Sequence, residues 1–437
     1  ATIVGYATGN LTVSGITVTG GNVTGGWEDG NTFSGGLIGE CPALLSMNSC
    51  RYYGNVTSNG GDNLGGLVGI AGADGTTISN SSFGSSSYLN GTLSLKGRNV
   101  GGIVGAFSTD NTININNCQV YASSITATSS YAGGVIGKSF GFTKISGCTV
   151  IVQANGYIAG ADDAGGIIGW LEDDNSSITN SSVKANVKAT RMCGGALGYF
   201  SGDNTVTVSN FTFDGSVYSA DDECRAGGVI GHTNGHLVLS DIVVKGGPIV
   251  SAKCDAGGLV GYVEDDDCTF TNCVNTANVT ASFCAGGIVG YCGAGAVSNF
   301  SRCINYGKIT SSGKTAGGIM GGCEWSSNTF GVISESANFG EVIAPSNAGG
   351  IVGKGCYTKA SRCFNFGNVH RNSATSGYSN GGVAGDQVRV EYSYNRGNVQ
   401  YGDYAGGILG YKGEVDYCYN TGNTSGALNN KVLTGYV

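Results

Sequence analysis

Residues 286–316 have the sequence GGIVGYCGAGAVSNFSRCINYGKITSSGKTA, and this stretch decides the fold. Its opening string, Gly-Gly-apolar-apolar-Gly, occurs thirteen times among the 437 residues. Between the first and the last occurrence, twelve intervals cover 371 residues, a mean of 30.9. A fixed period of this length is the signature of a repeat architecture. The repeats start near residues 1, 35, 65, 101, 133, 165, 194, 227, 257, 286, 317, 349, 381 and 406.

Each repeat contains three short runs of strand-forming residues. In residues 286–316 these runs are the apolar part of the motif, an alternating segment that ends at Asn305, and the segment 308–310. They are rich in β-branched residues and bounded by Gly, Asn or Ser, which favours strands. A propeller blade needs four strands in about 40 residues. We therefore predict an all-β fold: one parallel β-solenoid (β-helix) domain over residues 1–437, with about 14 coils, ~31 residues per coil and three short strands per coil.

The recurring glycines and asparagines have structural explanations. Gly supplies positive φ at coil corners and allows backbones or side chains to approach closely within strands. The Asn of each Asn-x-Gly turn tolerates the left-handed conformation, and its amide can bond to the same amide one coil away. We predict such a ladder, with a binding site as the alternative. Its members would be Asn275, Asn305, Asn338, Asn365, Asn395 and Asn420.

The pattern resembles a known repeat family. After Gly-Gly-apolar-apolar-Gly comes an Asn-Cys or Ser-Tyr element and then Asn-x-Gly-x-Val, as in residues 363–369 (CFNFGNV). This looks like the GLUG-type repeat of bacterial and protist surface proteins. The similarity is closest over 257–425, because the earlier repeats often lack the Asn-x-Gly turn. The resemblance implies a secreted, cell-surface or adhesin-like protein, and it brings no catalytic residues with it.

Composition excludes several classes of function. The net charge of −8 argues against a nucleic-acid partner, since phosphate contacts need clustered Lys and Arg. No stretch of about 18 apolar residues occurs, so no membrane span is predicted. With 80 Gly but only 3 Pro and no Gly-X-Y period, the chain resembles neither a disordered linker nor collagen. Residues 1–6 lack both an initiator Met and a signal-peptide pattern, so we expect a processed N-terminus or a longer chain.

Sixteen cysteines in an acidic, Gly-rich repeat indicate an oxidising compartment. Residues one coil apart lie about 4.8 Å from each other, within the range that a disulfide accepts. A zinc site is disfavoured because no Cys-x-x-Cys occurs. Cys363 and Cys418, two coils apart with Ser393 between them, are expected to be small buried residues. The predicted bridges are Cys193–Cys224, Cys254–Cys284, Cys118–Cys148, Cys273–Cys303 and, within a local loop, Cys41–Cys50.

Eleven Asn-x-Ser/Thr sequons are candidate glycosylation sites. Three of them, at Asn80, Asn180 and Asn210, come directly before the second-strand position that Cys118 and Cys148 occupy in other coils. If that position faces the core, the preceding Asn faces solvent, because strand side chains alternate. Glycans there would supply the solubility that the sparse charges do not. The sequons are at Asn10, Asn22, Asn55, Asn80, Asn90, Asn175, Asn180, Asn210, Asn278, Asn299 and Asn423.

Acidic residues gather in the turn that follows the motif, as in the strings 172–174 and 264–267. Carboxylates stacked on one edge can bind Ca²⁺, or can act as the acid and base of a glycan-cleaving enzyme. Asp also simply favours turns, and these turns lack neighbouring Arg, Lys or His, so a solvated turn is the preferred interpretation. The candidate Ca²⁺ ligands are Asp173, Asp174, Asp265 and Asp266; no other cofactor is predicted.

Two further groups of side chains have structural interpretations. His232 and His236 share one turn, but two His without a third ligand make a weak metal site. A tyrosine follows the last Gly of several motifs, which we predict to be an aromatic stack, with a sugar-binding face as the alternative. These tyrosines are Tyr6, Tyr199, Tyr262, Tyr291 and Tyr411.

The sequence as a whole predicts an extracellular structural or cell-surface adhesive rod that is not an enzyme. Because the end coils of a solenoid expose unpaired backbone, we expect end-to-end self-association or further domains of the same chain. Glycans are a second candidate partner. The alternative is a polysaccharide-acting β-helix enzyme, a lyase or hydrolase, that uses the acidic turn edge.

Overall fold

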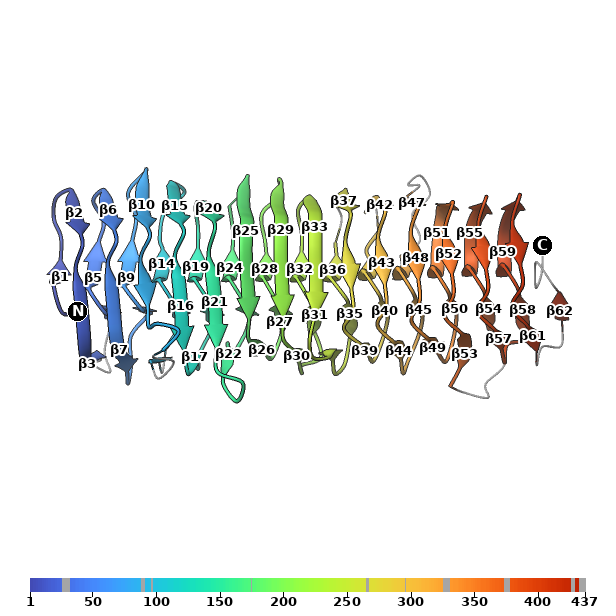
Figure 1. The fold of residues 1–437 in the computed structure, drawn as a ribbon, viewed down its shortest axis with the longest axis horizontal. Coiled ribbons are helices and arrows are strands. Elements are labelled where there is room, and N and C mark those ends of the chain that lie inside the picture. Colours follow the sequence, from blue (N-terminus) through green and yellow to red (C-terminus); the bar gives the residue numbers. More distant parts are fainter. Residues whose placement is uncertain are drawn as a thin grey trace. The chain divides into compact units, whose positions relative to one another are not determined.

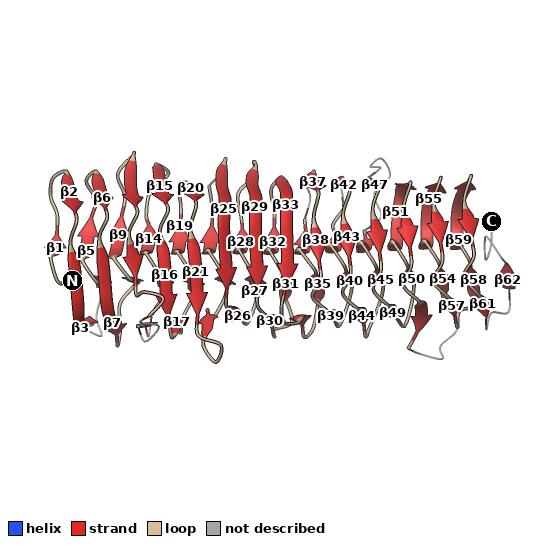
Figure 2. Cartoon of the chain, in the orientation of Figure 1, coloured by secondary structure: helices blue, strands red, loops and turns tan. Residues whose placement is uncertain are grey.

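A computed structural model describes residues 1–25, 32–87, 91–95, 97–173, 175–264, 267–294, 296–324, 331–372, 378–425 and 429–431. The chain separates into two compact units, Ala1–Ser219 (unit 1) and Ala220–Val437 (unit 2). Both units are built of strands and loops, as Figures 1 and 2 show, and the described residues contain no helix. Accordingly, no helix long and apolar enough to cross a membrane occurs in the described part of the chain.

A coil of unit 2 illustrates how the sequence becomes structure. The predicted first run is split into β40 (Ala285–Gly286) and β41 (Val289–Cys292). The second run is split into β42 (Ser298–Ser301) and β43 (Ile304–Asn305), and the third run is β44 (Ile309–Ser311). The three expected runs are therefore present, but a bend in the motif and a corner in the second run divide them into five strands.

The coils of unit 1 have the same plan. One of them consists of β18 (Tyr131–Gly133), β19 (Ile136–Ser139), β20 (Phe142–Ser146), β21 (Thr149–Val152) and β22 (Tyr157–Ala159). Over the chain the coils make about 12 turns of about 31 residues, slightly fewer than the 14 that the repeat count predicts. The all-β parallel solenoid is confirmed.

Within each unit strand pairing is parallel, and a strand pairs with its equivalent in the next coil. In unit 2, Val289 of β41 pairs with Val260 of β36 (Val260–Val263) on one side and with Met320 of β46 (Met320–Cys323) on the other. In unit 1, Ile136 of β19 pairs with Ile168 of β24 (Ile168–Leu171). The register shift thus equals the sequence period, so residues one repeat apart form a column.

Within each unit, the Gly-Gly part of the motif forms strands that pair with one another and not with the other strands of the coil. Its strands in unit 1 are β4 (Phe33–Gly35), β8 (Asn63–Gly65), β13 (Asn99–Gly101), β18, β23 (Ala164–Gly165) and β27 (Met192–Gly194). Its strands in unit 2 are β31 (Arg225–Gly227), β35 (Asp255–Gly257), β40, β45 (Ala316–Gly317), β50 (Ala348–Gly349), β54 (Ser379–Gly381), β58 (Tyr404–Gly406) and β62 (Asn429–Lys431).

The core consists of the inward side chains of every coil. In β20 and β21, Ile145 and Val150 are buried and alternate with more exposed residues, which is the pattern of a strand with one buried face. In the motif, the consecutive Ile288 and Val289 are both fully buried, because the chain bends between β40 and β41. This bend explains why the motif has an apolar pair instead of alternation.

The glycines of the motif are required by close approach of the backbone. A Cβ on Gly286 would lie 1.8 Å from the Val289 carbonyl oxygen. A Cβ on the next residue, Gly287, would lie 1.9 Å from the carbonyl oxygen of Gly318 in the following coil. The predicted role of the motif glycines in close approach is therefore confirmed. Their predicted role at left-handed corners is not, because no motif glycine is among the described residues with positive φ.

The left-handed corner lies elsewhere, at one position in the second run of each coil. Its φ values lie between 47° and 68°, and most of its residues are not glycine. The corner residues are Gly15, Ser49, Asn80, Asn117, Gly147, Asn180 and Asn210 in unit 1, and Asp241, Asn272, Arg302, Glu335, Arg362, Tyr392 and Tyr417 in unit 2. Asn is frequent because its short polar side chain tolerates this conformation.

Candidate functional site

The predicted asparagine ladder is present in unit 2. Asn305 illustrates its geometry: its Nδ2 donates to Asn338 Oδ1 at 2.8 Å and to the Gly307 carbonyl at 2.8 Å. Its Oδ1 accepts from Asn275 Nδ2 at 2.8 Å and from the Gly307 N–H at 3.2 Å. Both donors and both acceptor sites of this fully buried amide are therefore used. The ladder runs through Asn275, Asn305, Asn338, Asn365, Asn395 and Asn420.

The ladder lies directly beneath the Gly-Gly pair. A Cβ on Gly287 would stand 2.6 Å from Asn305 Cγ, so the two motif elements depend on each other. In unit 1 the corresponding column is apolar, and a Cβ on Gly102 would instead meet Val120. The apolar column consists of Tyr52, Phe83, Val120, Val150 and Val183. The Asn-x-Gly turn is therefore absent before residue 257 because apolar side chains replace asparagines in this column of the core.

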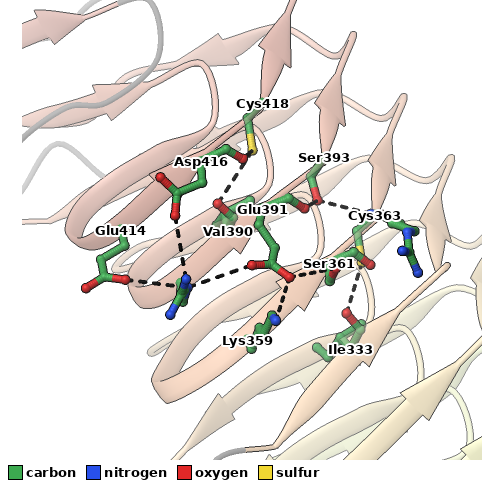
Figure 3. Close-up of polar contacts among 12 residues, drawn as sticks. Ile333, Lys359, Ser361, Cys363, Val390, Glu391, Ser393, Glu414, Asp416 and Cys418 are labelled. Atoms are coloured by element: carbon green, nitrogen blue, oxygen red, sulfur yellow. Dashed lines mark hydrogen bonds and ion pairs between the residues drawn. The ribbon is translucent and has the colours of Figure 1, made fainter.

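A second column, one residue beyond the left-handed corner, carries Cys or Ser in most coils. Cys363 Sγ donates to the carbonyls of Ile333 (3.3 Å) and Ser361 (3.5 Å). In the next coil, Ser393 Oγ donates to the Glu391 carbonyl at 2.8 Å and accepts from the Cys363 N–H at 3.0 Å (Figure 3). The thiol and the hydroxyl therefore have the same role: each forms hydrogen bonds with backbone groups at the corner. The interpretation of Cys363 as a small buried residue is confirmed, with this addition.

None of the five predicted disulfides is formed, and the ten cysteines concerned are free thiols. Cys118 is in register with Cys148, and Cys273 with Cys303, as the period predicts. However, in-register parallel neighbours stand about 4.8 Å apart with parallel side chains, whereas the Cβ atoms of a disulfide are about 3.8 Å apart. These thiols instead donate to backbone carbonyls, for example Cys148 to Ile115 at 3.7 Å.

The remaining predicted bridges also differ from the structure. Cys284 lies opposite Asp255, whose Oδ1 accepts from the Cys284 N–H at 3.0 Å, so Cys254 and Cys284 are one residue out of register. Cys41 Sγ donates to the Ala43 carbonyl, and Cys50 Sγ to the Asn48 carbonyl. Cys193 and Cys224 are buried free thiols of the two different units. For Cys254 and Cys284, the difference arises from a small offset within the repeat that the mean period conceals.

The asparagines of most sequons lie at the surface. Asn80, Asn180 and Asn210 occupy left-handed corners and are exposed, as alternation along the strand predicts. Asn210 Nδ2 donates to Asn180 Oδ1 at 2.8 Å. The corner conformation by itself selects Asn here, which accounts for part of the sequon count. The others are exposed (Asn10, Asn22, Asn175, Asn278, Asn423) or half-buried (Asn55, Asn299), and Asn90 lies outside the described residues.

The candidate Ca²⁺ ligands are only partly described. Asp174, Asp265 and Asp266 lie outside the described residues, and Asp173 is half-buried. Among described residues, no three His, Cys, Asp or Glu side chains are grouped to hold a metal ion. Asp74, in the same turn of another coil, accepts from the Thr112 N–H at 3.0 Å, and this hydrogen bond lowers the pKa of its carboxyl. This carboxylate accepts a hydrogen bond from the backbone of the next coil, as expected for an Asp with a structural role in a turn.

The two histidines of the shared turn have separate partners. His232 Nε2 lies 3.0 Å from Glu264 Oε2, and its ring meets the edge of Tyr262 at 4.9 Å. This hydrogen bond is the main cause of the lowered pKa of Glu264. His236 Nδ1 lies 3.2 Å from the Asp267 carbonyl oxygen, to which a protonated nitrogen would donate. The side chains of His232 and His236 therefore do not converge on one point where both could bind a metal ion.

Aromatic side chains stack along columns. Tyr262 and Tyr291, which follow the motif, have ring centroids 5.7 Å apart and nearly parallel planes, so the predicted stack is confirmed for this pair. A second stack at the surface joins Tyr306, Phe339 and Phe366 with centroid spacings of 4.9 Å. In both, ring faces cover each other, so the rings offer mainly edges to solvent. This geometry does not provide a flat platform for a sugar ring.

Charged side chains flank the surface of the last coils of unit 2. Arg389 lies 3.5 Å from Glu414 and 3.7 Å from Asp416, and Lys359 lies 2.5 Å from Glu391 (Figure 3). Most of these side chains are half-exposed, so solvent screens each pair and its contribution to stability is small. The pairs set the charge pattern of this surface.

A groove in unit 2 lies outside every feature that the sequence predicted. It has a volume of about 300 Å³ and runs across several coils, between the column that precedes the Gly-Gly pair and the column that follows the motif. Aligning the repeats by their period would have found it, since Gly322 stands where neighbouring coils have Tyr291 and Lys354. The same alignment would have revealed the corner, where five repeats carry Asn.

Comparison with known proteins identifies one motif. Residues 254–280 match the family model of the GLUG motif. This match begins at the repeat in which the ladder starts, with Asn275. Among curated proteins and solved structures, none matches the chain. A β-solenoid that carries a GLUG motif is consistent with a repeat protein of surface or structural type.

Proposed function

We propose that this GLUG-motif β-solenoid is an extracellular structural or cell-surface adhesive protein without enzymatic activity. The observation that carries the proposal is the repetition of chemistry along columns, as in the ladder from Asn275 to Asn420. Such columns stabilise a long, regular surface. An enzyme needs a singular arrangement of acid, base or nucleophile, and the acidic turns repeat loosely along the chain.

Surface composition supports an extracellular location. Charged residues make up only 12% of the chain, about half the usual share. Exposed sequon asparagines such as Asn180 and Asn210 would carry glycans that keep the protein soluble. End-to-end association is part of the same proposal, because a terminal coil of any solenoid presents unpaired strand edges.

The location is tested by labelling intact and permeabilised source cells with an antibody against unit 2. We expect labelling of intact cells and a loss of mass after treatment with a peptide-N-glycosidase. Labelling that requires permeabilisation would contradict the proposal. Electron micrographs of the purified protein at high concentration test assembly separately, since only isolated particles would exclude end-to-end association.

The enzymatic alternative has its own test. The purified chain is incubated with a panel of neutral and uronic-acid polysaccharides, and new reducing ends and unsaturated products are measured. We expect no product above that of a heat-unfolded sample. Cleavage that disappears when Asp173 is replaced by Asn, in a folded protein, would favour the lyase or hydrolase instead.

A further inference from the structure

The groove of unit 2 exists because one column lacks a side chain. In the column that follows the motif, Tyr291 pairs in register with Gly322, and Lys354 with Asp386. A Cβ on Gly322 would have Thr315 Oγ1 as its nearest neighbour at 2.8 Å, followed by Tyr291 at 3.5 Å. Gly322 is therefore the floor of the groove, between walls formed by larger residues.

One wall contains a carboxylate with one oxygen that makes no hydrogen bond. Asp386 lines the groove and is 8% exposed, and its Oδ1 has no hydrogen-bond partner. Burial raises the pKa of this carboxyl to about 6, against the opposing effect of Lys354 and Lys412. A buried acceptor without a partner costs free energy, which a ligand that donates a hydrogen bond would recover.

The other groups around the groove narrow the chemistry of that ligand. Ser379 Oγ donates to Asn347 Oδ1 at 3.0 Å on the opposite wall, so hydroxyl and amide groups lie in reach. Tyr404 and Tyr411 form one end, with ring centroids 4.8 Å apart. A metal ion is disfavoured, because Asp386 is a single carboxylate near two lysines. The fitting ligand is neutral or anionic, rich in hydroxyl donors, and apolar enough to contact tyrosine.

We propose that this groove binds a saccharide, with a sugar hydroxyl donating to Asp386 Oδ1 and the remaining hydroxyls contacting Asn347 and Ser379. Its volume of about 300 Å³ is at the lower end of the range for ligand pockets and fits a short saccharide or one part of a longer chain. The proposal rests on the proposed adhesive function and names the partner of that function.

Unit 1 contains a groove at the same place in the coil, which supports the assignment independently. It lies between the columns of Asn63 and Asn99 on one side and of Ala106 and Lys138 on the other. Ala106 is the small residue here, in register between Ile70 and Lys138. Asn99 Nδ2 donates to Asn63 Oδ1 at 2.7 Å, whereas Asn99 Oδ1 is buried without a partner. We assign this groove to the same class of ligand.

The test applies the purified full chain to an array of neutral and uronic-acid oligosaccharides and then titrates the best binder in solution. We expect saturable binding to at least one oligosaccharide. Gly322→Tyr fills the unit 2 groove and should extend the stack of Tyr262 and Tyr291, so this variant should remain folded and lose binding at one site. Ala106→Tyr should do the same in unit 1, and the double variant should lose binding by more than tenfold.

Two further variants keep the result interpretable. Asp386→Asn preserves shape and replaces an acceptor oxygen with a donor, so affinity at the unit 2 groove should fall about tenfold. Tyr306→Ser changes the exposed aromatic stack outside both grooves and should have no effect. Absence of binding to every oligosaccharide, or unchanged affinity in the folded double variant, would overturn the saccharide site. Surface labelling and assembly are measured without saccharide, so they fail or succeed separately.

Discussion

At the residue scale, the stability of unit 2 depends on asparagine amides that use all their hydrogen-bonding groups. Asn338 accepts from Asn305 and from the Gly340 N–H, and donates to Asn365 and to the Gly340 carbonyl. In the core a polar group is favourable only when it is satisfied, so each ladder member protects its neighbours from an unpaired buried group.

Replacing Asn338 by Ala should therefore be costly. The change removes one hydrogen-bond partner from each of the buried amides of Asn305 and Asn365 and the side-chain partner of the Gly340 backbone, and we expect a loss of about 3 kcal/mol in the free energy of unfolding. Asn368→Ala is the matched control, because this exposed amide makes one described hydrogen bond, to the Asn398 N–H. Denaturant unfolding checks both. Equal losses would show that the ladder contributes nothing beyond a surface amide.

The Cys and Ser column shows a second residue-scale rule. Because thiol and hydroxyl both donate to the carbonyls around the corner, the sequence can exchange them between coils. The sequence alone does not reveal that Cys363 and Ser393 are equivalent, since Cys is usually buried in proteins and Ser is usually exposed. Only their common place beside the left-handed corner explains it.

At the scale of elements, the corner and the Gly-Gly bend decide how each coil closes. The corner forces non-glycine residues such as Glu335 (φ 49°) into the left-handed region, which costs roughly 1 kcal/mol or more for most side chains. The bend brings backbones so close that a single methyl group has no room. Both elements make specific residue types necessary at fixed intervals.

Substitutions at Glu335 should change stability in opposite directions. Glu335→Asn introduces the residue that the corner already uses in five coils, and we expect a gain of about 0.5–1 kcal/mol in the free energy of unfolding. Glu335→Val introduces a β-branched side chain and should lose at least about 1 kcal/mol. Both variants lose the same exposed contact of Glu335 with Arg362, so thermal unfolding compares the corner effect alone. A gain from Val would refute the assignment of the corner.

Gly318→Ala tests the bend. The added Cβ would lie 2.0 Å from the Gly350 carbonyl oxygen and 2.4 Å from Asn338 Cγ, so the two neighbouring coils must move apart. We expect a loss of about 3 kcal/mol or more, or failure to fold. In Gly72→Ala the nearest atom is the flexible Ser108 Oγ at 3.2 Å, and this variant should stay within about 1 kcal/mol of the natural protein. Circular dichroism during urea titration measures both.

At the scale of the whole molecule, buried aspartates couple stability to pH. Asp163 is 2% exposed and accepts from the Met192 N–H at 3.1 Å, and burial raises its pKa to about 7. Asp255 is buried at the equivalent position of a repeat in unit 2, and burial raises its pKa to about 6. The folded chain therefore holds protons that the unfolded chain releases near pH 4.

Because these pKa values are raised on folding, their contribution to stability is complete below about pH 4 and is lost as the pH rises to about 7. Asp163→Asn removes this loss, so the stability difference between variant and natural protein should grow from pH 4 to pH 7 and then level off. Asp74→Asn should show the opposite dependence in a lower window, below about pH 4, since the pKa of Asp74 is lowered on folding and its contribution is lost as the pH falls. Denaturant unfolding at several pH values measures both slopes, and parallel slopes would contradict the burial effect.

Sequence by itself determined the stacking of coils, and the physical reason is the period. In a parallel solenoid the register shift equals the repeat length, so Asn305 and Asn338 must meet wherever the repeats stack. The ladder, the Tyr262–Tyr291 stack and the outward position of Asn180 all follow from this shift and from strand alternation. These features needed no knowledge of distances.

Only the tertiary structure decided what depends on distances between side chains. Whether Cys118 and Cys148 form a bridge depends on the separation of their Cβ atoms and on competing carbonyl acceptors, which the period does not specify. The grooves are likewise set by a small residue in the column that follows the motif, Gly322 in unit 2 and Ala106 in unit 1, and in unit 2 also by the burial of Asp386. A repeat fixes which residues are neighbours, whereas packing fixes how close they lie and which polar groups remain for a ligand.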